Sequence, residues 1–188
     1  GSHLRLELGI GIVAGGAIWG WAEKARREGP KPQSETDDAL YAECMRRRPD
    51  TARIGDLLRM GGSANAAGPC EEMGEAWMPC LMATMLWQTG LDDAELTRLL
   101  LESGADPNAE SPARGYSALL FAVANDKTES SRLLLRAGAD PNRFPWDTKR
   151  SSALQAAIGA PPRVQTSVME QLLRAGARTD LRDSTGHT

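Results

Sequence analysis

The sequence predicts an all-α solenoid, in which helix-turn-helix units stack side by side and project loops. The first observation is a repeat: Leu99–Asn108 and Leu133–Asn142 read LLLESGADPN and LLLRAGADPN and agree at eight of ten positions. The second is that Asp56–Asn65 and Gln171–Asp180 are weaker copies of this pattern. The third is that no single copy can bury its own apolar face. Such units become stable only by stacking, and at least three are needed.

The N-terminal part divides into a cloning remnant (residues 1–3) and an apolar segment (residues 4–26). Leu8–Ala22 contains fifteen residues without a charge. A membrane-spanning helix needs about 20 apolar residues, whereas the core of a signal peptide has about this length. However, Lys24 and Arg26 follow, and positive charge favours the cytoplasmic side. We expect residues 4–26 to be an export signal or a membrane anchor; a helix packed on the protein or on a partner is the alternative.

Residues 27–37 are expected to form a linker, because they are charged, contain Pro30 and Pro32 and show no apolar periodicity. Residues 38–188 are expected to form the folded domain, whose first helix would be capped by Asp37 or Asp38. The first helix of each unit is predicted by an apolar stretch with small residues, which let neighbouring helices approach closely. These stretches are Ala39–Met45, Leu81–Trp87, Ala118–Ala124 and Ala153–Ile158.

The second helix of each unit carries a leucine pair and is expected to end at a glycine. Glycine adopts at little cost the left-handed backbone conformation that caps a helix. The Ala-Asp-Pro-Asn sequence after it in the two central copies predicts an extended turn, because proline restricts the residue before it and asparagine suits turns. The four glycines are Gly61, Gly104, Gly138 and Gly176.

Unequal spacing between these glycines locates the longer loops. The spacings are 43, 34 and 38 residues, so the first interval contains an insertion of roughly ten residues. That insertion lies between Asn65 and Leu81, and the third interval is lengthened by Arg143–Arg150 and by a longer turn at Ala160–Arg163. The corresponding loop of the middle unit is Ala109–Tyr116. Loops that project from a rigid stack are where such proteins bind.

These features together resemble the ankyrin-repeat family over about residues 38–188. The resemblance is carried by the turns Gly104–Asn108 and Gly138–Asn142, and by Ser117–Ala122 and Ser152–Ala157, which match the helix-opening tetrapeptide and its continuation. It implies about four repeats that bind a partner protein through loop tips and first-helix faces. The family's usual histidine is absent from the tetrapeptide, which puts the usual inter-repeat hydrogen bonding in doubt. In its place stand Tyr41, Met82, Leu120 and Gln155.

The predicted partner-binding residues are aromatic and charged side chains of the loops. Aromatic residues and arginine are enriched among the residues that dominate binding energy. The first loop is acidic and the last is basic, which would orient a partner of opposite polarity. The alternative is that the rings fold back onto the stack and the charges are simply solvated. The predicted set is Glu71, Glu72, Trp77, Arg114, Tyr116, Arg143, Phe144, Trp146, Asp147, Lys149 and Arg150.

Composition argues against enzyme activity, cofactors and metals. The only histidines are His3, in the cloning remnant, and His187, so histidine-based catalysis and histidine-rich metal sites are nearly excluded. The three cysteines match no zinc or redox spacing. We expect free, buried thiols; in an oxidising compartment, one bridge between Cys70 and a neighbouring cysteine is the alternative. A net charge of −3 offers no broad footprint for nucleic acid.

The sequence therefore predicts a non-catalytic module that binds another protein. Within that class, the apolar segment and the ankyrin resemblance favour an inhibitor, such as an immunity protein against a secreted bacterial hydrolase or toxin. The alternative is a membrane-tethered scaffold or adaptor, in which residues 8–22 contact the membrane and are the functional part. The expected location is periplasmic or membrane-anchored, and a cytoplasmic location is the alternative.

Overall fold

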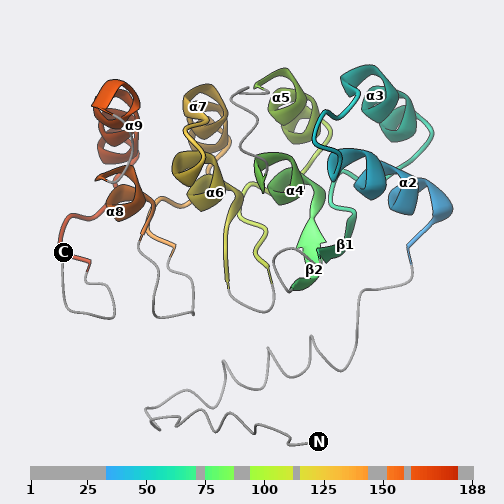
Figure 1. Cartoon of the computed structure of the whole chain (residues 1–188), viewed down its shortest axis with the longest axis horizontal. Coiled ribbons are helices and arrows are strands. Elements are labelled where there is room, and N and C mark those ends of the chain that lie inside the picture. The colour runs from blue at the N-terminus through green and yellow to red at the C-terminus, as the bar shows by residue number, and fades with distance from the viewer. Residues whose placement is uncertain are drawn as a thin grey trace, which may run out of the picture.

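The computed structural model describes residues 33–70, 75–86, 94–111, 115–143, 152–158 and 162–181. Within them, helices follow one another in four pairs, and a β-hairpin lies between the first pair and the second (Figure 1). The pairs are α2 (Glu35–Cys44) with α3 (Thr51–Arg59), α4 (Cys80–Leu86) with α5 (Ala94–Glu102), α6 (Ala118–Ala124) with α7 (Thr128–Arg136), and α8 (Ala153–Ile158) with α9 (Pro162–Arg174). The predicted helical solenoid is confirmed.

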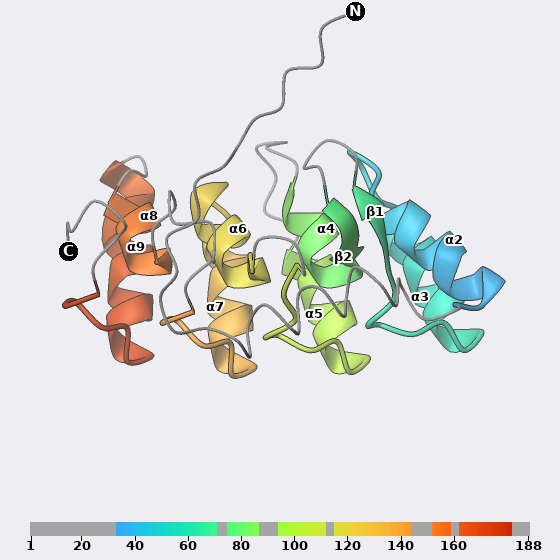
Figure 2. The ribbon, with the colours of Figure 1, turned by 90° about the horizontal axis from the view of Figure 1, so that it is seen from below.

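The helices form two layers. The first helices α2, α4, α6 and α8 make one row, and the second helices α3, α5, α7 and α9 make the other (Figure 1 and Figure 2). Each helix packs on its counterpart in the next pair. Because every interior repeat is covered on both sides, the core runs along the stack rather than around one centre.

The predicted glycine stops are confirmed. At the end of α7, the Gly138 N–H donates to the Leu135 carbonyl at 3.1 Å and the Ala139 N–H donates to the Leu134 carbonyl at 3.0 Å. The second bond closes the helix in the manner of a Schellman motif, which requires a left-handed residue after the cap. The φ angles lie between 87° and 98° at Gly61, Gly104, Gly138 and Gly176.

The first helix starts earlier than the sequence predicts. Ser34 caps α2, instead of Asp37 or Asp38. The Asp37 N–H donates to Ser34 Oγ at 3.1 Å, and the Ser34 N–H donates to the Asp37 carboxylate at 3.2 Å. This capping box satisfies two helix-terminal donors and places acidic side chains in the first turn, where the helix dipole favours them. The predicted linker is therefore wrong for residues 33–37, which belong to the folded domain.

The last helix begins inside a predicted turn. Glycine spacing assigns Ala160–Arg163 to a lengthened turn, yet α9 starts at Pro162. Proline suits the first position of a helix because its missing N–H would have no partner there and its φ is already helical. The additional residues therefore lengthen the helix, which has 13 residues against nine in α7.

The first insertion contains a β-hairpin, which the all-α prediction missed. β1 (Ala67–Cys70) pairs antiparallel with β2 (Glu75–Pro79), with Gly68 opposite Met78. These strands read AGPC and EAWMP and contain none of the β-branched residues that favour strands. Trp77 is the one residue of the two strands that favours strands, so the local signal was weak, and the hairpin depends on its contacts with α2 and α4.

Contacts with α2 hold the hairpin in place. The ring of Tyr41 lies so close to Gly68 that a β-carbon there would overlap it, and Tyr41 Oη donates to the Pro69 carbonyl at 2.9 Å. The Gln33 side chain accepts from the Ala67 N–H at 2.9 Å and donates to the Ala67 carbonyl. One amide side chain thus occupies the outer edge of β1 as a neighbouring strand would, and the base of the insertion is part of the core.

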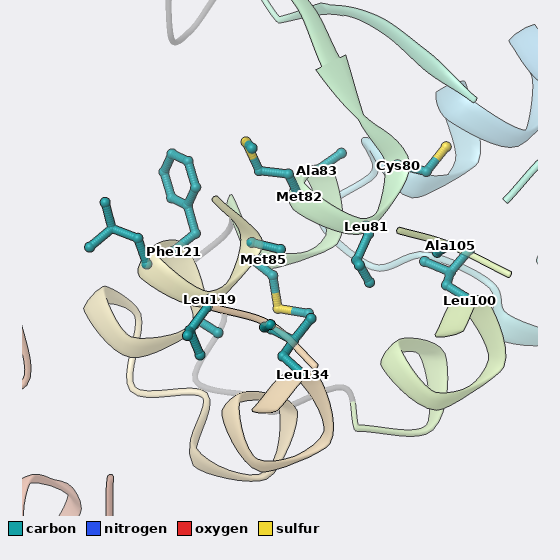
Figure 3. Close-up of a cluster of buried hydrophobic side chains, with 14 of the residues drawn as sticks. Cys80, Leu81, Met82, Ala83, Met85, Leu100, Ala105, Leu119, Phe121 and Leu134 are labelled. Carbon is teal, nitrogen blue, oxygen red and sulfur yellow. The ribbon is translucent and has the colours of Figure 1, made fainter. Parts of the chain in front are cut away.

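Leucine and small residues fill the space between the two layers. Leu100, Leu134 and Leu172 are completely buried, as the leucine-pair pattern predicts. Figure 3 shows this core where α4 meets the next repeat, with Met85 directed toward Leu134. Small side chains at the interfaces between first helices let their backbones approach closely, and the completely buried ones are Ala83, Ala122 and Ala157.

The last described repeat differs from the interior repeats at two equivalent positions. Ile158 is 54% exposed, whereas Met85 and Val123 at the same place in earlier repeats are 1% exposed. Leu173 is 47% exposed, whereas its counterpart Leu135 is partly buried against the core. In the interior, the following repeat covers these side chains. Their exposure in the fourth repeat marks the end of the described stack.

Candidate protein-binding surface

The candidate surface is the row of first helices together with the structures that project beside it. The hairpin β1–β2 and the loop before α6 leave the stack on the same side, next to α4 and α6 (Figure 1). Several accessible side chains of the first helices are small or apolar, and such side chains suit the apolar centre of an interface. They are Ala42, Leu86, Ala124 and Ala156, while α2 also exposes the acidic side chains of Glu35 and Asp38.

An asparagine ladder connects the repeats at the base of the loops. Asn108 Nδ2 donates to the Gly138 carbonyl at 2.9 Å, and Asn108 Oδ1 accepts from the Asp140 N–H at 2.8 Å. Because one side chain serves both a donor and an acceptor of the following turn, it holds successive loops at a fixed spacing. The same two bonds recur between Asn65 and Gly104 and Asp106, and between Asn142 and Gly176 and Arg178.

The ladder is a structural role that the sequence interpretation missed. Each of these asparagines was interpreted as a local turn residue, whereas it binds the backbone of the next repeat. The signal was present, since Asn65, Asn108 and Asn142 each stand four residues after a helix-ending glycine. Asparagine, unlike aspartate, carries a donor and an acceptor on separate atoms of one short side chain.

Hydrogen bonds between repeats are present although the family's histidine is absent from the tetrapeptide. Gln155, which stands at one such position, donates from Nε2 to the Leu181 carbonyl at 3.2 Å and accepts the Ser152 N–H at 2.9 Å. Met82 and Leu120 are buried at the same position in earlier repeats. There the contribution is apolar packing, while the asparagine ladder supplies the polar connection.

The loop before α6 is a finger held closed by its own backbone. The Ser111 N–H donates to the Tyr116 carbonyl at 2.9 Å, and Glu110 forms an isolated antiparallel bridge with Ser117. Arg143, which follows the next repeat's turn, forms an ion pair with Glu110. Neighbouring loops are thus joined at their bases. About a third of the Arg143 side chain, 35%, stays exposed, and its role in partner binding stays a prediction.

Tyr116 is not a surface residue, so its prediction as a partner contact is wrong. Only 1% of it is exposed, and its ring packs edge-to-face on Phe121, with centroids 5.5 Å apart and an interplanar angle of 81°. The tight turn of this loop directs the ring into the stack, where an aromatic pair adds more stability than its buried area alone would give. The alternative interpretation, in which loop rings fold back, is the correct one for this residue.

Trp77 lies on β2 and is half-buried. Its indole Nε1 is inaccessible to solvent and meets no hydrogen-bond acceptor among the described residues. The ring is therefore partly turned into the protein, and the exposed remainder keeps the prediction of a partner contact open. The other predicted partner-binding residues lie outside the described residues. They are Glu71, Glu72, Arg114, Phe144, Trp146, Asp147, Lys149 and Arg150.

A buried carboxylate organises the turn between α2 and α3. Glu43 is 5% exposed and accepts from the Asp50 N–H and from Arg46 Nη1, both at 3.1 Å. Its second oxygen lies 3.4 Å from Arg53 Nε. A buried charge is tolerated when it is paired and hydrogen-bonded in this way. The two arginines, both largely exposed, contribute positive charge at the N-terminal end of the stack.

A second carboxylate connects the start of α2 with the turn after α3. Asp37 accepts from the Ser63 N–H at 2.6 Å, in addition to its bond with Ser34. The hydrogen bond from Ser63 is the main cause that lowers the pKa of Asp37 below its usual 3.8, and partial burial opposes it. Because the ionised form accepts both bonds, this contact is strongest above that pKa.

Two classes of site receive no support from the described part of the chain. It contains no group of histidine, cysteine and acidic residues that could hold a metal ion. Among the helices described, none is both long enough and apolar enough to cross a membrane.

Comparison with protein families agrees with this architecture. The family model described as ankyrin repeats, with three copies, matches residues 83–184 of the chain. That range covers more than half of the sequence and includes the third and fourth helix pairs and all but the first three residues of the second. No match was found among the curated proteins compared with the chain.

Proposed function

Because the chain belongs to the ankyrin-repeat family, whose repeats indicate protein–protein interaction modules, we propose that it is a non-catalytic inhibitor that binds and occludes a partner protein. The partner class we propose is a secreted bacterial hydrolase or toxin, against which the chain would act as an immunity protein. The proposed contact surface is the first-helix row with the hairpin and loops beside it.

The observation that carries this proposal is that the described bases of the hairpin and loops are held in place by contacts within the chain itself. Tyr41 and Gln33 hold the hairpin, the Glu110–Arg143 ion pair joins two loops, and the asparagine ladder spaces the turns. A surface that is already ordered loses little conformational freedom on binding, so more of the contact energy appears as affinity. Tight occlusion of a partner needs such preorganisation.

A pair of matched substitutions tests the proposed surface. Ala124 is exposed on α6, in the first-helix row, and Ala52 is exposed on α3, in the other row. Changing either alanine to arginine adds the same charge and bulk. We expect Ala124→Arg to weaken binding at least tenfold, and Ala52→Arg to leave affinity unchanged, because only the first obstructs the proposed contact.

The measurement requires a defined partner. The full chain is used to isolate a binding protein from its source cells, and that protein is purified and titrated calorimetrically with each variant. If the partner is an enzyme, its turnover is measured with and without the chain. Loss of affinity from Ala52→Arg alone would move the contact to the other row, and full turnover by a saturated partner would exclude inhibition.

A membrane-tethered scaffold is the second candidate, and the charge-free stretch Leu8–Ala22 is the observation that favours it. In that case the apolar segment, rather than the repeat surface, would be the functional part. Flotation with lipid vesicles distinguishes the two functions. Tethering predicts that the full chain floats and that a chain starting at Gln33 does not, whereas an equal distribution of both chains would reject it.

A further inference from the structure

Two cysteines meet where the first repeat packs on the second. Cys44 is the last residue of α2, Cys80 is the first residue of α4, and these helices pack on each other. Both residues are completely buried in one core cluster, and Cys44 is the group that most strongly raises the pKa of the Cys80 thiol. Figure 3 shows Cys80 on the side of α4 that faces α2, away from Phe121. Helix packing therefore juxtaposes two thiols that are distant in sequence.

We propose that Cys44 and Cys80 are a cross-linking site, at which an oxidant that itself carries a disulfide forms an intramolecular bond between the first and second repeats. In the structure all three cysteines are free thiols. The product would fasten the end of α2 to the start of α4. Since β2 ends at Pro79, directly before Cys80, the bond would also secure the base of the hairpin.

This pairing differs from the one that the sequence favoured. Spacing alone suggested that Cys70 would take part in any bridge, because it is the middle cysteine. Cys70 instead lies on β1, where its partner across the hairpin is Glu75. The cysteine that raises the pKa of the Cys80 thiol is Cys44. Chain separation is a poor guide here, because the packing of α2 on α4 brings together residues that are far apart in sequence.

The reaction requires two exchange steps with an oxidant such as oxidised glutathione. One cysteine thiolate attacks the oxidant, whose S–S bond breaks, and the released thiolate takes up a proton. The second cysteine thiolate then attacks the protein sulfur of this mixed disulfide and releases a second small thiol. In total the two cysteines lose two protons and two electrons, and the oxidant is reduced to two thiols.

Burial controls when this reaction occurs. The hydrogen bond to Cys44 and burial raise the pKa of the Cys80 thiol well above its ordinary range, so little thiolate forms in the closed protein. The oxidant also cannot reach a residue with no exposed surface. The bond must therefore form while the first repeat is open, either during folding or in a local opening of this terminal repeat. Mild denaturant should accelerate it.

The cross-link should be strongly stabilising. It closes a loop of about 36 residues, and closing a loop of that size removes considerable entropy from the unfolded chain. For a protein of this length we expect the Tm to rise by roughly 5–10 °C. Both cysteines already lie in one core cluster where α2 packs on α4, so we expect little rearrangement of these helices.

The experiment uses the full chain, reduced and then incubated with oxidised glutathione in a series of low urea concentrations. Remaining thiols are blocked with N-ethylmaleimide, and the cross-linked peptides are identified by mass spectrometry. We expect one intramolecular bond between Cys44 and Cys80, a blocked Cys70, faster formation with urea and a Tm increase that dithiothreitol reverses. Cys70→Ala should leave both the bond and the Tm shift intact, whereas Cys44→Ala should abolish them.

Several results would overturn the proposal. A predominant bond to Cys70, stable glutathione adducts without a cross-link, or only intermolecular dimers would each show that the two thiols are not a productive pair. Peptide mapping of the unsubstituted chain decides this even if a cysteine variant fails to fold. None of these outcomes depends on the identity of the partner protein, so the test is independent of the proposed function.

Discussion

Replacing Asn108 with alanine removes one rung of the asparagine ladder. The side chain makes two inter-repeat hydrogen bonds, to the Gly138 carbonyl at 2.9 Å and from the Asp140 N–H at 2.8 Å. Each such bond contributes about 0.5–1.5 kcal/mol. Because Gly138 and Asp140 are exposed, water can replace the lost partners, so we expect the lower part of the summed range, about 1–2 kcal/mol.

Urea unfolding followed by circular dichroism measures this loss. In thermal unfolding of the same variant, we expect the Tm of Asn108→Ala to fall by roughly 3–6 °C. Glu102→Ala is the control, since Glu102 is an exposed residue at the end of α5 just before the same turn, and such surface changes stay within about 0.5 kcal/mol. In a stacked protein, weakening one interface can also uncouple the repeats on either side of it.

Additivity provides the stricter test. Asn65 and Asn142 belong to separate rungs with no shared partner, so the two alanine substitutions should add within about 0.5 kcal/mol. The ladder account would be refuted if Asn108→Ala changed the free energy of unfolding by less than about 0.5 kcal/mol at an unchanged urea dependence. The rungs would then be a geometric consequence of stacking rather than a source of its stability.

Three further predictions concern the hairpin, the end of the stack and acid stability. Gly68→Ala should destabilise the protein by about 1–3 kcal/mol, because the added β-carbon overlaps the Tyr41 ring. Gly55→Ala should instead stabilise α3 by about 0.5–1 kcal/mol, because its β-carbon meets only Leu99 and Arg59, at 3.8 Å and beyond. Chemical denaturation of both variants checks this contrast, and equal effects would contradict it. Met85→Ala should lower the free energy of unfolding by about 2–5 kcal/mol, and the equivalent Ile158→Ala by about 1 kcal/mol or less, because Met85 is 1% exposed and Ile158 is 54% exposed. Thermal unfolding measures both losses. A similar loss for the two variants would show that something covers Ile158. The pKa of Asp37 lies below its unfolded value of 3.8, so its stabilisation is present above that value and is lost as the pH falls through the folded-state pKa. Between pH 5 and pH 2.5, Asp37→Asn should therefore lose less stability than the unsubstituted chain. Parallel curves of unfolding free energy against pH would exclude this contribution.

Features set by nearest neighbours in the chain could be predicted from the sequence. The first helices were placed within a few residues at α4, α6 and α8, because apolar stretches and glycine stops act locally. The left-handed backbone conformation of Gly138 could be predicted, because the residue ends a helix and glycine adopts this conformation at little cost. The error at α2 had a local cause as well: Ser34 and Asp37 form a capping box, and the sequence interpretation considered only the aspartates as caps.

The candidate binding surface was less predictable, because exposure is a property of the assembled stack. Tyr116 and Trp77 were both assigned to loops, yet the finger turns Tyr116 into the core and β2 half-buries Trp77. Arg143 was assigned to a partner, and the structure pairs it with Glu110 from the preceding loop. An aromatic or charged residue in a loop has no intrinsic direction; its neighbours from other repeats decide whether it turns outward.

The sequence by itself determined the number of repeats, the positions where their helices end and the stacked architecture, because each depends on a periodic pattern and on glycine's backbone freedom. Only the tertiary structure decided that an insertion without β-branched residues becomes a hairpin, that each ladder asparagine binds the next repeat, and that Cys44 rather than Cys70 lies beside Cys80. These outcomes depend on groups that are distant in the chain. Packing brings such groups together, and no local preference of either partner specifies the contact.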